Sequence, residues 1–117
     1  MAKYAGKAGR RWVLESARAI LPDIRERTAR AVGEVERFEA ERAHLREGEE
    51  LAEIEERIQG EFSRWVREME ALGVEVRGVW LVDFDTGSGC FCWKWPEREV
   101  EWFHGYEEGF GGRVRIQ

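Results

Sequence analysis

One histidine near the carboxyl end of the chain is the sharpest candidate for chemistry. His104 ends an aromatic segment and is followed closely by the acidic pair Glu107 and Glu108. Imidazole titrates near neutral pH and can serve as a general base or as a metal ligand. Arg113 follows a glycine-rich turn, and its planar guanidinium suits a carboxylate or a phosphate. The sequence therefore predicts a small-anion or metal pocket at a sheet end, lined by His104, Glu108, Arg113 and Phe91.

The same side chains also have a purely structural interpretation. The ring of His104 can close the end of an aromatic sheet face, with one nitrogen bonded to a backbone carbonyl or to a glutamate. Arg113 can pair with Glu107, with Glu108 or with a helix surface. The sequence contains no nucleophile and base pair and no nucleotide-binding motif. We therefore expect a protein without catalytic activity, and we predict no cofactor.

Three weaker candidates are Asp83, Cys92 and Trp95. Carboxylate, thiolate and imidazole are all zinc ligands, so Asp83 and Cys92 would form a metal site if they met His104. Trp95 precedes Pro96 at the end of an aromatic segment, and we expect it to be the most exposed tryptophan. Whether Asp83 and Cys92 lie near His104 depends on how the strands pair.

Three aromatic and β-branched segments, at residues 79–84, 90–95 and 100–104, predict an antiparallel meander. Turn residues at 86–89 and 96–99 separate them, and residues 114–116 are a candidate terminal strand. The large apolar side chains share one face if Asp85 pairs with Cys90 and Trp95 pairs with Val100. This register puts Asp83 and Cys92 on one face and His104 on the other. We therefore predict no metal site.

Upstream of the strands, the hydrophobic spacing is helical. Two heptad series predict two long helices that pack as an antiparallel hairpin. Pro22 predicts a kink or a break in the first helix, and Gly73 predicts the end of the second. The two series are Ala17, Leu21, Ile24, Thr28, Ala31, Val35, Phe38, Arg42 and Leu45, then Leu51, Ile54, Ile58, Phe62, Trp65, Met69 and Leu72.

The predicted fold class is α+β, with a long antiparallel helical hairpin packed on a small three- to four-stranded antiparallel meander. Residues 1–117 form one domain: a loose basic arm at 1–11, the hairpin at 12–73, and the meander with a glycine-rich tail at 74–117. Within the tail, Phe110 is expected to enter the core. At about 1.5 Å per residue the hairpin is longer than short strands can cover. Its distal half is expected to pack on another subunit, which predicts a homodimer.

The composition excludes some classes of function. The net charge of −5 and the pI near 5.2 argue against nucleic-acid binding, apart from a local role for the basic arm. No apolar run approaches the roughly 20 residues that span a bilayer, so we expect a cytoplasmic protein that does not bind membranes. Glu and Arg far outnumber Asp and Lys, and asparagine is absent. This bias is typical of heat-adapted proteins, although GC-rich coding also favours arginine.

A specific series of motifs follows in order along the carboxyl-terminal half: Leu81-Val82-Asp83-Phe84, Cys92-Trp93-Lys94, Trp102-Phe103-His104, Gly109-Phe110 and Gly112-Arg113. With this series, most of the chain resembles a bacterial family known as domain of unknown function 2203. Upstream, Ala19-Ile20-Leu21-Pro22 is similar to the family's Ala-Leu-Leu-Pro segment, but Val13 replaces the threonine that precedes the first helix, so a hydroxyl cap is missing. The resemblance implies the fold and the position of the site, and it leaves the activity open.

Two functions follow from these patterns. The first is a non-catalytic homodimeric interaction or scaffold module, which the heptad series favour. The alternative is a small-anion or metal pocket, with or without catalysis, at the sheet end around His104 and Arg113.

Overall fold

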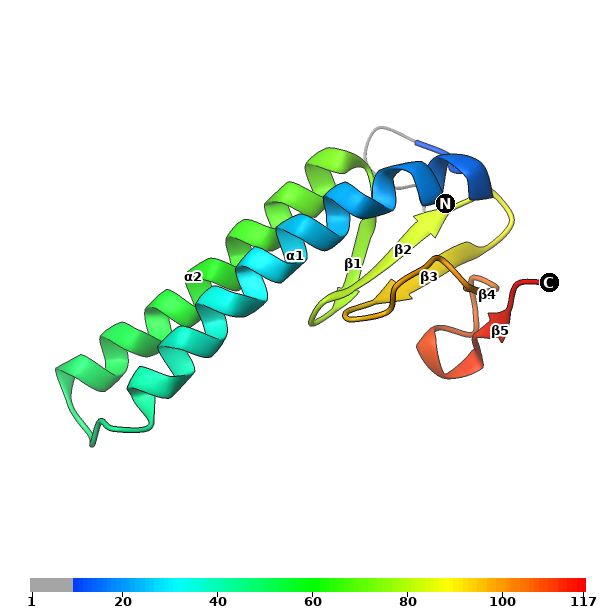
Figure 1. Cartoon of the computed structure of the whole chain (residues 1–117). Coiled ribbons are helices and arrows are strands. Elements are labelled where there is room, and N and C mark those ends of the chain that lie inside the picture. Colours follow the sequence, from blue (N-terminus) through cyan, green and yellow to red (C-terminus); the bar gives the residue numbers. More distant parts are fainter. Residues whose placement is uncertain (1–9) are drawn as a thin grey trace.

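A helical hairpin with a small sheet packed against one end makes up the molecule (Figure 1). This computed structural model describes residues 10–117, so most of the predicted basic arm lies outside the described residues. Helix α1 is Leu14–Arg42 and helix α2 is Glu49–Leu72. The hairpin extends well past the sheet, and the molecule measures 48 × 30 × 24 Å. The predicted α+β class and the antiparallel hairpin are confirmed.

The two helices of the hairpin bury side chains at the predicted heptad positions. The buried residues of α1 are Ala17, Leu21, Ile24, Thr28, Ala31 and Phe38, and those of α2 are Ile54, Trp65 and Met69. One polar pair lies among them. The indole Nε1 of Trp65 donates to Thr28 Oγ1 at 2.9 Å, and that hydroxyl donates to the Ile24 carbonyl at 2.7 Å. Each buried polar atom of this pair therefore has a partner.

The helix ends follow from the residues at each terminus. Val13, the residue before α1, makes no side-chain cap, but Ser16 Oγ accepts the Val13 N–H at 3.1 Å and so takes over part of that role. Pro22 lies inside α1, so the predicted break was wrong. Leu21 and Ile24, on either side of the proline, are both buried in the core. Gly73 ends α2 with a φ of 94°, a left-handed conformation that glycine adopts without strain.

The sheet has five antiparallel strands in the order of the chain. They are β1 Glu75–Gly78, β2 Leu81–Asp85, β3 Cys90–Lys94, β4 Trp102–His104 and β5 Val114–Arg115. The three predicted strands and the terminal strand are present, each over a shorter span. Strand β1 was not predicted, because its four residues contain a single apolar side chain, Val76.

The predicted register is right for one pair of strands and wrong for the next. Asp85 pairs with Cys90, as expected, but Cys92 rather than Trp93 pairs with Trp102. The reason is the connection between β3 and β4, which runs from 95 to 101 instead of 96 to 99. Val100 leaves the strand there and is fully buried in the core. The shift by one residue turns β4 over and moves His104 to the other face of the sheet.

One face of the sheet packs on the hairpin and the other carries polar groups. Val82, Phe84, Trp93 and Val100 enter the core beside Trp12 and Trp65. Phe110 does not join them, because its side chain lies in the tail and is 42% exposed, so that prediction was wrong.

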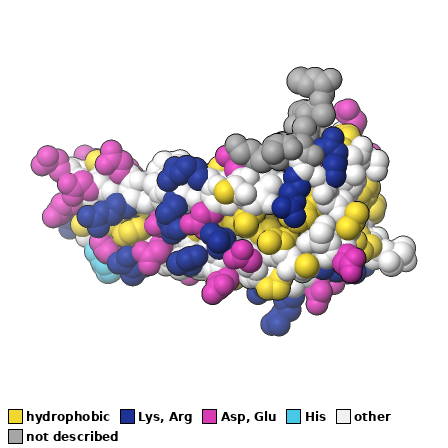
Figure 2. All heavy atoms as spheres, turned by 90° about the horizontal axis from the view of Figure 1, so that it is seen from above, with side chains coloured by type: hydrophobic (Ala, Val, Ile, Leu, Met, Phe, Trp, Pro, Cys, Tyr) yellow, Lys and Arg dark blue, Asp and Glu magenta, His cyan; other side chains and the backbone are white. Residues whose placement is uncertain are grey.

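Side chains of both charges cover the hairpin, and apolar side chains gather at the surface where it meets the sheet (Figure 2). No helix within residues 10–117 is long and apolar enough to span a bilayer.

Candidate metal site

Three potential metal ligands from three neighbouring strands meet on the polar face of the sheet. Asp83 lies in the middle of β2, Cys92 is directly opposite on β3, and His104 ends β4. One ligand atom from each lies within 4.8 Å of the other two, and each residue is at most 2% exposed. In a tetrahedral zinc site, bonds of about 2.0 to 2.3 Å place ligand atoms roughly 3.3 to 3.8 Å apart. The three side chains therefore need only small movements to surround one ion.

Hydrogen bonds on both sides of the His104 ring determine which nitrogen faces the other two ligands. Nδ1 lies 2.7 Å from the Gly105 carbonyl, which can only accept, so Nδ1 carries a proton. Nε2 lies 3.0 and 3.1 Å from the two carboxylate oxygens of Asp83. A proton must therefore lie between Nε2 and the carboxylate in the absence of metal. A backbone bond at Nδ1 is the arrangement that orients a histidine to bind metal through Nε2.

The remaining two ligands are buried acids with raised pKa values. Burial raises the pKa of Asp83, although the hydrogen bond from His104 opposes this. Burial, and then the charge of Asp83, raise the pKa of the Cys92 thiol to about 12. Arg113 acts in the opposite direction, with Nη1 3.9 Å from the Cys92 sulfur. Two anions so close together are unfavourable unless a cation joins them. A divalent ion would supply that charge.

The predicted site residues Arg113 and Glu108 lie next to this cluster and support it. The guanidinium carbon of Arg113 lies over the rings of Trp102 and Phe110, 4.7 and 4.1 Å from their centroids, and Nη1 pairs with Glu97 Oε2 at 2.9 Å. Glu108 Oε1 accepts the Gly105 N–H at 2.7 Å. The carboxylate therefore holds the backbone at Gly105. The backbone N–H of Glu108 also donates, at 3.2 Å, to the Gly105 carbonyl that bonds the ring of His104.

Two other predicted residues lie away from the cluster. Phe91 points to the core side of the sheet and contacts the ring of Phe103, with 5.8 Å between ring centroids. Trp95 is half-buried beside Trp93, and the guanidinium of Arg25 lies 5.2 Å from its ring. Neither side chain lines the cavity next to His104.

A cavity of about 170 Å³ opens beside the three ligands. Its other walls come from the tail and from the two strands at the near edge of the sheet. It is lined by Arg77, Leu81, Asp83, Cys92, His104, Gly109 and Phe110.

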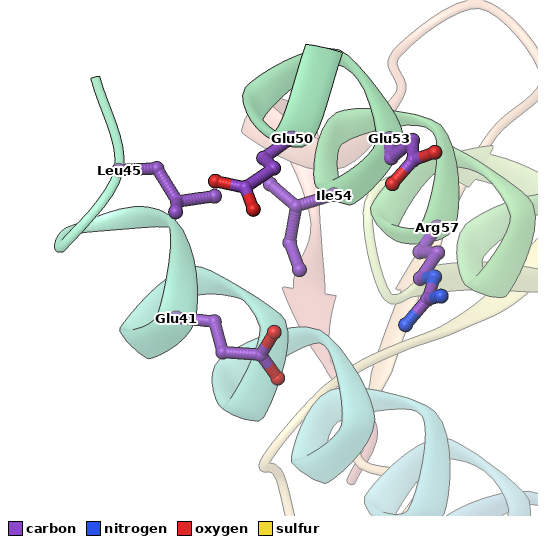
Figure 3. Close-up of a pocket in the computed structure, with 6 residues that line it drawn as sticks. All are labelled: Glu41, Leu45, Glu50, Glu53, Ile54 and Arg57. Carbon is purple, nitrogen blue, oxygen red and sulfur yellow. The ribbon is translucent and has the colours of Figure 1, made fainter. Parts of the chain in front are cut away.

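A second hollow, at the tip of the hairpin, has a different character. Figure 3 shows carboxylates of α1 and α2 around it, together with Leu45, Ile54 and Arg57. Glu41, Glu50 and Glu53 are all exposed, so solvent screens their charges. Within residues 10–117, Asp83, Cys92 and His104 are the one group of three or more such side chains placed to share an ion.

The sequence matches the family described as Uncharacterized conserved protein (DUF2203) over residues 10–116. The chain belongs to this family. Neither a curated protein nor a solved structure matches the sequence. The match to the DUF2203 family confirms the resemblance inferred from the strand motifs, and it covers the hairpin as well as the site.

The expectation that His104 faces away from Asp83 and Cys92 was wrong. It depended on the register of β4, which the longer connection changes. Sequence reasoning also missed Arg77, a wall of the cavity on the unpredicted strand β1. A single charged residue in a short polar segment gave no signal that would have found it.

Proposed function

We propose that the protein binds a transition-metal ion, with zinc as the best fit, through Asp83, Cys92 and His104. The observation that carries this proposal is the meeting of a carboxylate, a thiol and an imidazole within 4.8 Å. The hydrogen bond from Nδ1 of His104 to Gly105 supports it, because it leaves Nε2 directed at the other two ligands.

The kinds of ligand select the kind of ion. Thiolate and imidazole are ligands for zinc, copper and iron, whereas magnesium and calcium take oxygen atoms almost alone. A set with one carboxylate, one thiolate and one imidazole is acceptable to zinc in tetrahedral geometry. Cys92 must be reduced to bind, so a reducing compartment such as the cytoplasm suits this function.

Metal binding is tested by titrating Zn²⁺ into the metal-free full-length chain by calorimetry, and by native mass spectrometry of the product. We expect one ion per chain, and loss of binding in Cys92→Ala and in His104→Ala. Cys90→Ala is the matched control, because Cys90 is also buried on β3 but lies outside the ligand group. Equal zinc affinity in the Cys90 and Cys92 variants would refute the proposal.

A second function, a homodimeric interaction module, is favoured by an apolar groove on the hairpin. The groove holds about 430 Å³ between the two helices and the turn before β2, and Val79 at its edge is 58% exposed. The hairpin beyond the sheet has no covering element among the described residues. We propose that a second copy of the chain packs here, since two such grooves related by a twofold axis would bury each other's apolar walls. The apolar residues that line the groove are Val32, Val35, Ile58, Phe62, Val79 and Trp80.

Sedimentation velocity measures this association directly. We expect a dimer at micromolar concentration, and a monomer when Val35→Glu places a charge in the groove. Ala29→Glu, an exposed position on the same helix, is the control and should leave the dimer intact. A wild-type monomer at these concentrations would remove the dimer from the proposal without affecting the metal site.

A further inference from the structure

The three ligands leave one side of the proposed metal site without a protein donor. Zinc sites with a structural role are closed by four protein ligands, whereas sites with three keep a position for an outside ligand. Among residues 10–117 no fourth side chain joins the group. The cavity of about 170 Å³ lies against all three ligand residues, so an outside ligand would reach the ion from there. A water molecule takes up about 30 Å³ of liquid volume, so the cavity has room for a molecule of several heavy atoms.

The charges around the loaded site cancel when each is counted once. The two positive charges of a divalent ion are balanced by the Asp83 carboxylate and the Cys92 thiolate. Arg77 also lines the cavity, and its Nε lies 3.9 Å from Asp83 Oδ2. The charge of Arg77 is matched by Glu75, which is on the same strand and directly opposite Asp83 in the sheet. Arg77 therefore leaves no surplus positive charge that would select an anion.

The second guanidinium beside the ligands is matched in the same way. Nη1 of Arg113 lies 3.9 Å from the Cys92 sulfur and 2.9 Å from Glu97 Oε2. An anion that entered the cavity would have to give up its hydration without a net positive charge to replace it. A neutral ligand does not have this cost, so the charges at the site favour a neutral ligand.

Apart from Arg77, the cavity walls away from the three ligands carry no charge. They are formed by Leu81 at the start of β2 and by Gly109 and Phe110 in the tail. Phe110 is 42% exposed, so a ligand that packs against its ring would remove apolar surface from water. Aromatic rings pair favourably in edge-to-face or offset arrangements, beyond the effect of buried area. The cavity therefore suits a flat, apolar ring.

We propose that the metal-loaded site binds a small, neutral heteroaromatic base, such as a pyridine or an imidazole. The lone pair of a ring nitrogen occupies the open coordination position in place of water, and the ring packs against Phe110 and Leu81. Aromatic nitrogen is a donor that suits zinc, copper and iron. This inference rests on the proposed metal site.

Three probes of nearly the same shape separate the effect of the donor atom from the effect of charge. Nicotinamide is neutral and has a ring nitrogen, nicotinate has the same ring with a negative charge, and benzamide lacks the ring nitrogen. Each probe is titrated into the full-length chain loaded with Co²⁺, which takes the place of zinc and whose visible spectrum reports its coordination. We expect nicotinamide to change the visible bands saturably and benzamide to leave them unchanged. Nicotinate should bind about tenfold more weakly than nicotinamide, because its carboxylate meets no net positive charge.

Two variants of the tail test the apolar wall. Phe110→Ala should weaken nicotinamide binding by about three- to tenfold, because it removes the contact between the two rings. It should not change the affinity for Co²⁺, since Phe110 is outside the ligand group. Val114→Ala is the matched control, because Val114 is an exposed apolar residue of β5 that does not line the cavity. This variant should change neither affinity.

Four results would contradict these expectations in different ways. Failure to bind Co²⁺ at all would refute both the metal site and the ligand site. A Co²⁺-loaded protein whose bands nicotinamide does not change would refute the ligand site and leave the metal site intact. Nicotinate that binds as tightly as nicotinamide would refute the preference for a neutral ligand. Equal nicotinamide affinities in the wild type and in Phe110→Ala would refute the packing of the ring on Phe110.

Discussion

His104 is held from both sides of its ring, and this fixes what the residue can do. Its Nδ1 donates to a backbone carbonyl, so the ring cannot turn without losing that bond. Its Nε2 bonds to Asp83, and the thiol of Cys92 belongs to the same group of ligand atoms within 4.8 Å of one another. A side chain that is only 2% exposed and fully bonded is ordinary for a structural histidine. The buried cysteine beside it is what makes the metal interpretation stronger than the structural one.

Metal binding at these residues should release protons and strengthen as pH rises. The zinc-bound form needs a thiolate at Cys92, whose pKa burial raises to about 12 in the metal-free protein, and an unprotonated Nε2 at His104. At neutral pH, zinc must therefore displace about two protons per ion, one from the thiol and one from the His104–Asp83 pair. Calorimetric titrations in buffers of different ionisation enthalpy measure this number. Binding that is independent of pH between 6 and 8 would contradict it.

Glu108 should act through the peptide that it holds rather than by touching the ion. Glu108→Ala removes the acceptor of the Gly105 N–H and so loosens the backbone of the residue whose carbonyl orients His104. Loss of such an outer partner typically costs about 10- to 100-fold in metal affinity, and we expect a value at the low end. Glu107→Ala is the matched control at the neighbouring exposed position. Equal zinc affinities in the two variants would show that Glu108 has no positioning role.

At the scale of the elements, the polar pair inside the hairpin fixes how α1 and α2 pack. Thr28→Val keeps the shape of the side chain but leaves the indole N–H of Trp65 buried without an acceptor. We expect a loss of about 1 to 3 kcal/mol in the free energy of unfolding, measured by denaturant titration.

The double variant Thr28→Val with Trp65→Phe tests this reason. Phenylalanine has no N–H to satisfy, so the penalty for the orphaned donor should disappear. The cost of Thr28→Val in the Trp65→Phe background is the free-energy loss of the double variant minus that of Trp65→Phe alone. We expect this cost to be smaller than the cost of Thr28→Val in the wild type. An unchanged effect would show that the hydrogen bond is not the cause.

The elements differ in how far the sequence could predict them. The hairpin follows from heptad spacing, because each helix must bury one apolar stripe. The pairing of β2 with β3 follows from side-chain alternation across a short turn. The position of β4 does not, because it depends on how many residues the connection at 95–101 uses and on where Val100 turns inward. The meeting of Asp83, Cys92 and His104 was missed for this reason, although all three were recognised as candidate residues.

Different interactions stabilise the two ends of the molecule. The hairpin beyond the sheet depends on helix packing and, as we propose, on a second chain. At the tail end, Arg113 contacts the rings of both Trp102 and Phe110 and so connects the tail to β4. The proposed metal site lies between these ends, on β2, β3 and β4. An ion there would add a link between three strands that are already paired through their backbones and packed through their apolar face.

Zinc should therefore stabilise the folded chain as a whole. A ligand that binds only the folded state adds about 2.7 kcal/mol at a free concentration 100 times its Kd, which corresponds to roughly 10 °C in Tm for a domain of this size. Thermal unfolding with and without Zn²⁺ measures the shift, and a chelator should reverse it. Cys90→Ala should keep the shift and Cys92→Ala should lose it, because only Cys92 belongs to the ligand group. A shift of equal size in both variants would mean that the ion acts elsewhere on the protein, since the ligands of the proposed site would then be irrelevant to its effect.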